Sequence, residues 1–126
     1  MIFVSRIVVL VREYSEALAF YEQAFGFSII HDHTSASGQR FVHIGPEGHD
    51  TGIWLLESED ESRIGEQTGG EPVMTLTTDD LLGLHAHLTK SGVIITSPIT
   101  RTPEASFFHC HDLYGNGIVI TQFEEL

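Results

Sequence analysis

The same order of secondary-structure signals occurs twice along the chain, and this duplication narrows the folds that the chain can adopt. A run rich in β-branched residues, Ile2–Val11, precedes a helical stripe that ends at Gly26, and a second run, Val73–Thr77, precedes a stripe that ends at Gly92. The two glycines are 66 residues apart, and a fixed offset between equivalent signals indicates an internal duplication. We therefore predict an α+β chain built from two copies of one βαβββ unit.

The first unit is predicted to contain one strand, one helix and three shorter strands. Ser15 is a good N-cap residue, and the apolar stripe that follows it is typical of a helix that covers a sheet. Gly26 occupies the C-cap position, where glycine tolerates a left-handed backbone. Turn-forming Ser, Gly and Pro separate the shorter strands. These strands are Phe27–His31, Gln39–Ile44 and Gly52–Leu56.

The second unit repeats this order. Asp79 is the predicted N-cap of its helix, Leu81, Leu84 and Leu88 form the apolar stripe, and Gly92 ends the helix. Its later strands are predicted at Val93–Thr96, Ser106–Cys110 and Gly117–Phe123. We expect a single domain over residues 1–126, with one module over about 1–57, an acidic connector over 58–71 and a second module over about 72–126.

The chain is strongly acidic, with 18 Asp and Glu against 6 Lys and Arg and a formal net charge of −12. This balance argues against nucleic acids and acidic membrane surfaces as partners, because both need a basic protein face. No apolar run approaches the roughly 20 residues that span a bilayer, and no secretory signal pattern opens the chain. The single cysteine, Cys110, excludes an intrachain disulfide. We therefore expect a soluble cytoplasmic protein.

Several short motifs carry a more specific resemblance. They are the segment Val11–Tyr21 closed by Gly26 and Phe27, the helix start Thr78–Leu81, and the turn Asp112–Asn116 before the last strand. With the repeated βαβββ unit, they resemble the vicinal-oxygen-chelate superfamily of glyoxalases, extradiol dioxygenases, fosfomycin-resistance enzymes and bleomycin-resistance proteins. The resemblance spans nearly the whole chain. It implies curled mixed sheets around a cleft, with the helices outside, and it covers metal-dependent catalysts as well as metal-free binders.

The metal-dependent members of that family carry His, Glu or Gln at four cleft-facing positions. The resemblance places these positions at Arg6, Trp54, Val73 and Val119. A divalent metal needs several nitrogen or oxygen donors with lone pairs, whereas valine offers none and a guanidinium repels the cation. We therefore expect no cofactor and no metal at these positions, in the manner of the bleomycin-resistance-like members.

The histidines leave an alternative open. His109 and His111 share one face of a predicted strand, and His43 could join them around a divalent metal or act as a general base. The alternative function is thus a lyase, isomerase or dioxygenase-type enzyme with a non-standard histidine site. Cys110 lies on the opposite strand face and is expected to be a buried, unreactive thiol.

The side chains predicted to line the cleft suit binding better than bond breaking. They combine an aromatic stacking surface with one fixed cation and several hydrogen-bonding groups. The predicted ligand-binding residues are Arg6, Phe41, His43, Trp54, Thr75, Thr77, His109 and His111. We predict a metal-independent protein that sequesters an aromatic or cationic small molecule, since an acidic protein attracts cations. The family resemblance also implies a homodimer.

Overall fold

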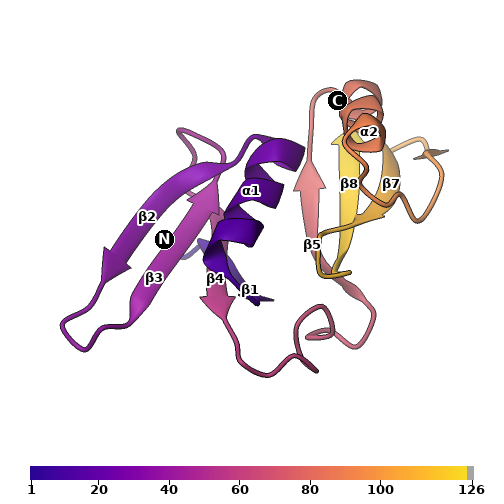
Figure 1. Ribbon diagram of the computed structural model, residues 1–126. Helices are drawn as coiled ribbons and strands as arrows, with labels where there is room; N and C mark the ends of the chain where they lie inside the picture. Colours follow the sequence, from indigo (N-terminus) through magenta and orange to yellow (C-terminus); the bar gives the residue numbers. More distant parts are fainter. Residues whose placement is uncertain (125–126) are drawn as a thin grey trace. The chain divides into compact units, whose positions relative to one another are not determined.

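The computed structural model describes residues 1–124, which form two compact units, one over Met1–Gln67 and one that begins at Thr68. Each unit contains one helix and one four-stranded sheet (Figure 1). The elements of the first unit are β1 (Arg6–Val11), α1 (Tyr14–Phe25), β2 (Ser28–Thr34), β3 (Arg40–Gly45) and β4 (Gly52–Glu57). Those of the second are β5 (Pro72–Thr77), α2 (Leu81–Lys90), β6 (Thr100–Arg101), β7 (Ala105–His111) and β8 (Gly117–Phe123). The prediction of two βαβββ units is confirmed.

The first sheet has the strand order β1-β4-β3-β2, with β1 and β4 parallel and the other neighbours antiparallel. Successive side chains of a strand point to opposite faces, and α1 covers one of these faces (Figure 1). The strand residues that form the core are at most 2% exposed. They are Val9, Val11, Val42, Ile44, Ile53 and Leu55. Ala17, Tyr21 and Ala24 of α1 are equally buried, so the hydrophobic core of this unit lies between helix and sheet.

The second sheet has the order β5-β8-β7-β6, with β5 and β8 parallel. The ring of His85 in α2 meets the ring of Phe108 in β7 edge-on, with the ring centroids 4.9 Å apart. The helix therefore lies against the face of the sheet that carries Phe108. Phe108, Cys110, Ile118 and Ile120 are completely buried. The predicted alternation in β7, with Cys110 in the core, is confirmed.

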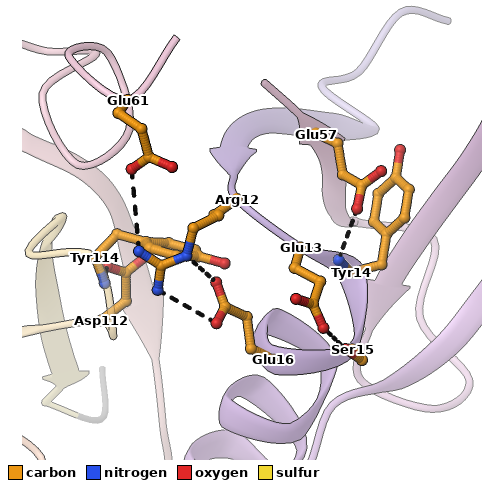
Figure 2. Close-up of polar contacts among 9 residues, drawn as sticks. All are labelled: Arg12, Glu13, Tyr14, Ser15, Glu16, Glu57, Glu61, Asp112 and Tyr114. Atoms are coloured by element: carbon orange, nitrogen blue, oxygen red, sulfur yellow. Dashed lines mark hydrogen bonds and ion pairs between the residues drawn. The ribbon is translucent and has the colours of Figure 1, made fainter. Parts of the chain in front are cut away.

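The start of α1 differs from the prediction. Glu13 is the N-cap residue and makes no capping hydrogen bond with its side chain, while Ser15 lies in the first turn and donates its hydroxyl to the Glu13 carboxylate. The Glu57 carboxylate, at the end of β4, accepts the Tyr14 N–H at 3.1 Å (Figure 2). A carboxylate near a helix N-terminus satisfies an unpaired N–H and also suits the helix dipole. The prediction that Ser15 is the N-cap is therefore wrong. The carboxylate that accepts an N–H at the helix start comes from Glu57, which is distant in sequence.

The bounds of α2 also differ slightly from the prediction. The N-cap is Asp80 and not Asp79, since the Asp80 carboxylate accepts the Gly83 N–H at 3.0 Å. The C-cap is Ser91, and Gly92 follows it with a φ of 82°. Neither α1, with 12 residues, nor α2, with 10, could cross a bilayer, and residues 1–124 contain no other α-helix.

The first predicted strand begins later than its apolar run. Ile2–Val4 are exposed and lie outside β1, which starts at Arg6. The partner strand explains this limit, because Arg6 pairs with Gly52, the first residue of β4. Beyond that point there is no neighbouring strand in the described chain to pair with, so β-branched sequence alone does not extend the strand.

The strand predicted at Val93–Thr96 is also wrong. Only Ile95 pairs there, through an isolated bridge to Cys110, and the strand that pairs with β7 on the side away from β8 is the short β6 at Thr100–Arg101. Both sheets are mixed, as expected, but they are not strongly curled (Figure 1). Four strands accumulate only the ordinary twist of about 20–25° per strand and remain open.

Candidate functional site

The face of the first sheet opposite α1 carries an aromatic and cationic group of residues. Arg6 starts β1, Phe41 and His43 lie on β3, and Trp54 lies on β4. All four are partly buried, and those on β3 and β4 alternate with fully buried core residues. The structure thus places half of the predicted ligand-binding residues on one sheet face. We call these four residues the Trp54 face.

Aromatic rings lie side by side across three strands of this sheet. Trp54 is opposite His43 in the β3–β4 register, and their ring centroids are 5.5 Å apart. Phe41 lies 5.9 Å from Trp54, and His31 of β2 lies 5.1 Å from His43 on the other side. The rings are tilted by 43–51° to one another. They give this face a continuous row of π surfaces, which suits contact with a planar ligand.

The Arg6 side chain fixes the protonation of His43. Its Nε donates to His43 Nδ1 at 3.1 Å, while Nη1 donates to the carbonyl oxygens of Ser5 at 2.7 Å and Asp50 at 2.8 Å. A guanidinium can only donate, so Nδ1 must be the unprotonated nitrogen of the imidazole. His43 is therefore neutral in this arrangement, with its proton on Nε2.

Two N–H groups of the Trp54 face have no hydrogen-bond partner. Within residues 1–124, neither His43 Nε2 nor Trp54 Nε1 is hydrogen bonded, and both atoms are buried. An unpaired buried donor costs about 1–3 kcal/mol, and such groups are uncommon in folded proteins. The indole nitrogen can only donate, and the tautomer of His43 makes Nε2 a donor too. The side chains of this face therefore offer donors but no free acceptor.

The other half of the predicted ligand-binding residues lies in the second unit, on the sheet face opposite α2. These residues are Thr75, Thr77, His109 and His111. Thr75 and His109 flank Val119 in the strand register, and His111 is opposite Gly117. Thr77 Oγ1 lies 3.1 Å from the hydroxyl oxygen of Thr121. This second face is more polar than the Trp54 face and contains no indole.

The sequence matches the model of the glyoxalase/bleomycin resistance protein/dioxygenase superfamily over residues 4–120. The chain belongs to this superfamily. It resembles the crystal structure of TnmS3, an antibiotic binding protein from Streptomyces sp. CB03234, with a TM-score of 0.81 and 26% identity over 98% of each chain. A glyoxalase/bleomycin resistance protein from the same organism gives a TM-score of 0.76 and 26% identity, covering 95% of this chain and 100% of that one. A Shewanella frigidimarina (strain NCIMB 400) protein described as uncharacterized is 29% identical over 116 residues, 87% of this chain and 85% of its own.

The residues at the four positions that the family resemblance assigned to metal ligands do not fit the metal chemistry of the glyoxalase superfamily. Arg6 and Trp54 belong to the Trp54 face, while Val73 lies on β5 and Val119 on β8. The Arg6 guanidinium already donates three hydrogen bonds, and neither the indole nor the two valines has a lone pair for a cation. Across residues 1–124, no group of three or more His, Cys, Asp or Glu is arranged to hold a metal.

The alternative histidine site is also poorly supplied with lone pairs. His43 uses the lone pair of Nδ1 to accept from Arg6, so it has none left for a metal or for a substrate proton. His109 and His111 do share one face of β7, as predicted. Their register partners on β8 are Val119 and Gly117, and neither supplies a third ligand.

Cys110 is unsuited to nucleophilic chemistry. Its side chain is completely buried. Burial, with a smaller contribution from the charge of Asp112, raises the pKa of the thiol to about 11. Because the thiolate is the reactive form, the residue is a core side chain, in agreement with the sequence.

Two further features of the first unit were not part of the predicted site. His31 was expected to face solvent near the end of a strand, and it is exposed. Its ring also extends the aromatic row, which only the β2–β3 register could have indicated.

A cavity of about 390 Å³ lies where α1 ends and β2 begins. It is lined by Leu18, Glu22, Gly26, Phe27, Ser28 and Ile29. Gly26 and Phe27 mark the helix end in the sequence, but the cavity was not predictable because it depends on how helix and strand meet.

The environment of His43 predicts a pH-dependent stability. Burial lowers its pKa from the ordinary 6.5, and the positive charges of Arg6 and His31 lower it further. Below about pH 6.5 the unfolded chain therefore binds more protons than the folded chain. We expect this contribution to the free energy of unfolding to be complete above pH 6.5 and to be lost as the pH falls through the lowered pKa. One proton limits the slope to about 1.4 kcal/mol per pH unit.

Urea unfolding of the wild type and of His43→Gln between about pH 5 and 7 measures this slope. The variant should show a smaller dependence on pH. His49→Gln, which removes a histidine from an exposed turn, should keep the wild-type slope. Equal slopes in the wild type and His43→Gln would show that His43 is not the group responsible.

Proposed function

We propose that the chain is a metal-independent binding protein that sequesters an aromatic or cationic small molecule, such as an antibiotic, against the Trp54 face. The observation that carries this proposal is the row of aromatic rings with two unpaired N–H groups beside a fixed guanidinium. Small-molecule sites commonly combine apolar or aromatic surface with a few polar groups that orient the ligand. The likeness to TnmS3, which is an antibiotic binding protein, supports the same proposal.

Binding without chemistry is the simpler use of these residues. His43 lacks a free lone pair for a base, the Cys110 thiol is buried and protonated, and the positions that the family resemblance assigned to metal ligands carry Arg6, Trp54, Val73 and Val119. Arginine, indole and phenyl groups remain, and these recognise shape, charge and π surface. Sequestration requires only such recognition, since the bound compound is withheld from its target without being changed.

We also propose that the protein acts as a homodimer. Apolar side chains are unusually exposed next to β1, with Ile2 100% and Val4 73% exposed, and a second copy would cover such side chains. The family resemblance supports the same assembly.

Native mass spectrometry of gently purified protein tests the function and the assembly together. We expect a dimer without stoichiometric divalent metal, whose mass is unchanged by a chelator. Any retained organic mass would begin to identify the ligand. Near-stoichiometric metal would contradict the metal-independent function, and a monomer at micromolar concentration would contradict the dimer.

A further inference from the structure

We propose that the compound held by the Trp54 face is a planar aromatic whose edge carries a hydrogen-bond acceptor oxygen, either a carbonyl or a phenolate. Trp54 Nε1–H and His43 Nε2–H donate to that oxygen. This inference rests on the proposed function and narrows it to neutral or anionic ligands.

The hydrogen-bonding polarity of the unpaired groups limits which polar groups a ligand can carry. Both unpaired atoms of the Trp54 face are N–H donors, and the remaining polar side chain, Arg6, also only donates. A ligand whose only polar groups are N–H or ammonium donors would leave the N–H groups of Trp54 and His43 without an acceptor. A carbonyl oxygen has two lone pairs and can accept from both Trp54 and His43, whose rings are neighbours at 5.5 Å.

The local charge differs in sign from the charge of the whole chain. The chain carries −12, but the two carboxylates on the strands of this sheet, Asp32 and Glu57, lie on its other face. Asp32 of β2 binds Arg40 at 2.7 Å, and Arg40 in turn lies 5.3 Å from the ring of Tyr14 in α1. Glu57 accepts the Tyr14 N–H on that same side. The strand positions of the Trp54 face carry Arg6 and no acidic residue, so a cationic ligand would meet repulsion there.

The unpaired groups also indicate how the oxygen would be bound. Neither N–H contacts solvent in this conformation, so an acceptor reaches them only when the Trp54 ring turns, while His43 keeps its hydrogen bond from Arg6. Rotamer changes of this size are common at binding surfaces. Turning a ring toward the ligand pairs a buried donor that was unpaired. This lowers the free energy only if the ligand supplies an acceptor, because another donor cannot pair with the N–H.

A pair of tricyclic compounds of equal shape tests the inference. Acridone carries a neutral carbonyl at the position where 9-aminoacridine carries an amino group, and the latter is a cation at pH 7. Both are fluorescent, so their affinities follow from fluorescence anisotropy in about 0.15 M salt, which screens the long-range attraction of the acidic chain for the cation. We expect acridone to bind the wild type at least tenfold more tightly than 9-aminoacridine.

Trp54→Phe keeps an aromatic ring and removes the indole N–H, so it should reduce this preference about fivefold. His43→Leu removes the second donor and should act in the same direction, with circular dichroism to confirm that the variant is folded. Equal or tighter binding of 9-aminoacridine, or a preference unchanged in both variants, would overturn the inference while leaving an aromatic binding protein. If neither compound binds, the proposed function fails first and the inference with it.

Discussion

Replacing Trp54 with alanine is expected to weaken acridone binding by about ten- to a hundredfold. The substitution removes the largest ring of the Trp54 face and one of its two unpaired donors. Stacking of a planar heterocycle on an aromatic side chain is worth about 1–3 kcal/mol by alanine substitution, and 1.4 kcal/mol corresponds to a tenfold change in affinity. Trp54 is the only tryptophan, so the alanine variant has no indole fluorescence with which to follow binding. The fluorescence anisotropy of acridone reports binding to both proteins.

The cavity at the end of α1 supplies the matched control. Phe27 lines it and stacks on Tyr21 at 6.4 Å, on the helix-covered side of the sheet. Phe27→Ala removes an aromatic ring of comparable burial without changing the Trp54 face, so it should leave acridone affinity within about twofold. If instead Phe27→Ala weakens binding and Trp54→Ala does not, the ligand occupies the cavity and the site has been assigned wrongly.

The fold was predictable because its signals are local and repeated. Alternation along a strand has a strict period of two, so the positions of Phe41, His43 and Trp54 opposite the core followed from the sequence. Gly26 was equally clear, because its φ of 70° is a conformation that glycine adopts without strain. The start of α1 was not predictable from local sequence. Ser15 is not its N-cap, and the carboxylate that accepts an N–H at the helix start comes from Glu57, which is distant in sequence.

The chemistry of the site was less accessible to sequence reasoning than its location. The residue types at Arg6 and His43 were identified as ligand-binding candidates, but their mutual hydrogen bond depends on the register of β3 with β4 and on the side-chain rotamers. That bond fixes the tautomer of His43 and makes the free groups donors. The sequence therefore left open whether the ligand is cationic. The hydrogen-bonding groups of the Trp54 face favour a neutral or anionic aromatic instead.

The second large effect concerns stability. Asp112→Ala is expected to lower the free energy of unfolding by about 3 kcal/mol, or roughly 10 °C in Tm. Asp112 is 5% exposed, and Asn116 is 2% exposed. One carboxylate oxygen of Asp112 accepts the backbone N–H groups of Tyr114 and Asn116 at 2.9 Å, and the other accepts the Asn116 amide at 2.8 Å. Alanine would leave these donors without the carboxylate in a site that admits little water, as urea or thermal unfolding would show.

Asp60 provides the comparison, because it forms the same kind of turn on the surface. Its carboxylate accepts the Ser62 N–H at 3.1 Å, and Asp60 is exposed, so water replaces the carboxylate after Asp60→Ala and the loss should be much smaller. Asp112→Asn keeps one acceptor oxygen and should recover part of the stability lost in Asp112→Ala. Equal losses for the two alanine variants would mean that the buried turn between β7 and β8 contributes no more than a solvated one, and that the motif resembling the superfamily has another role in this chain.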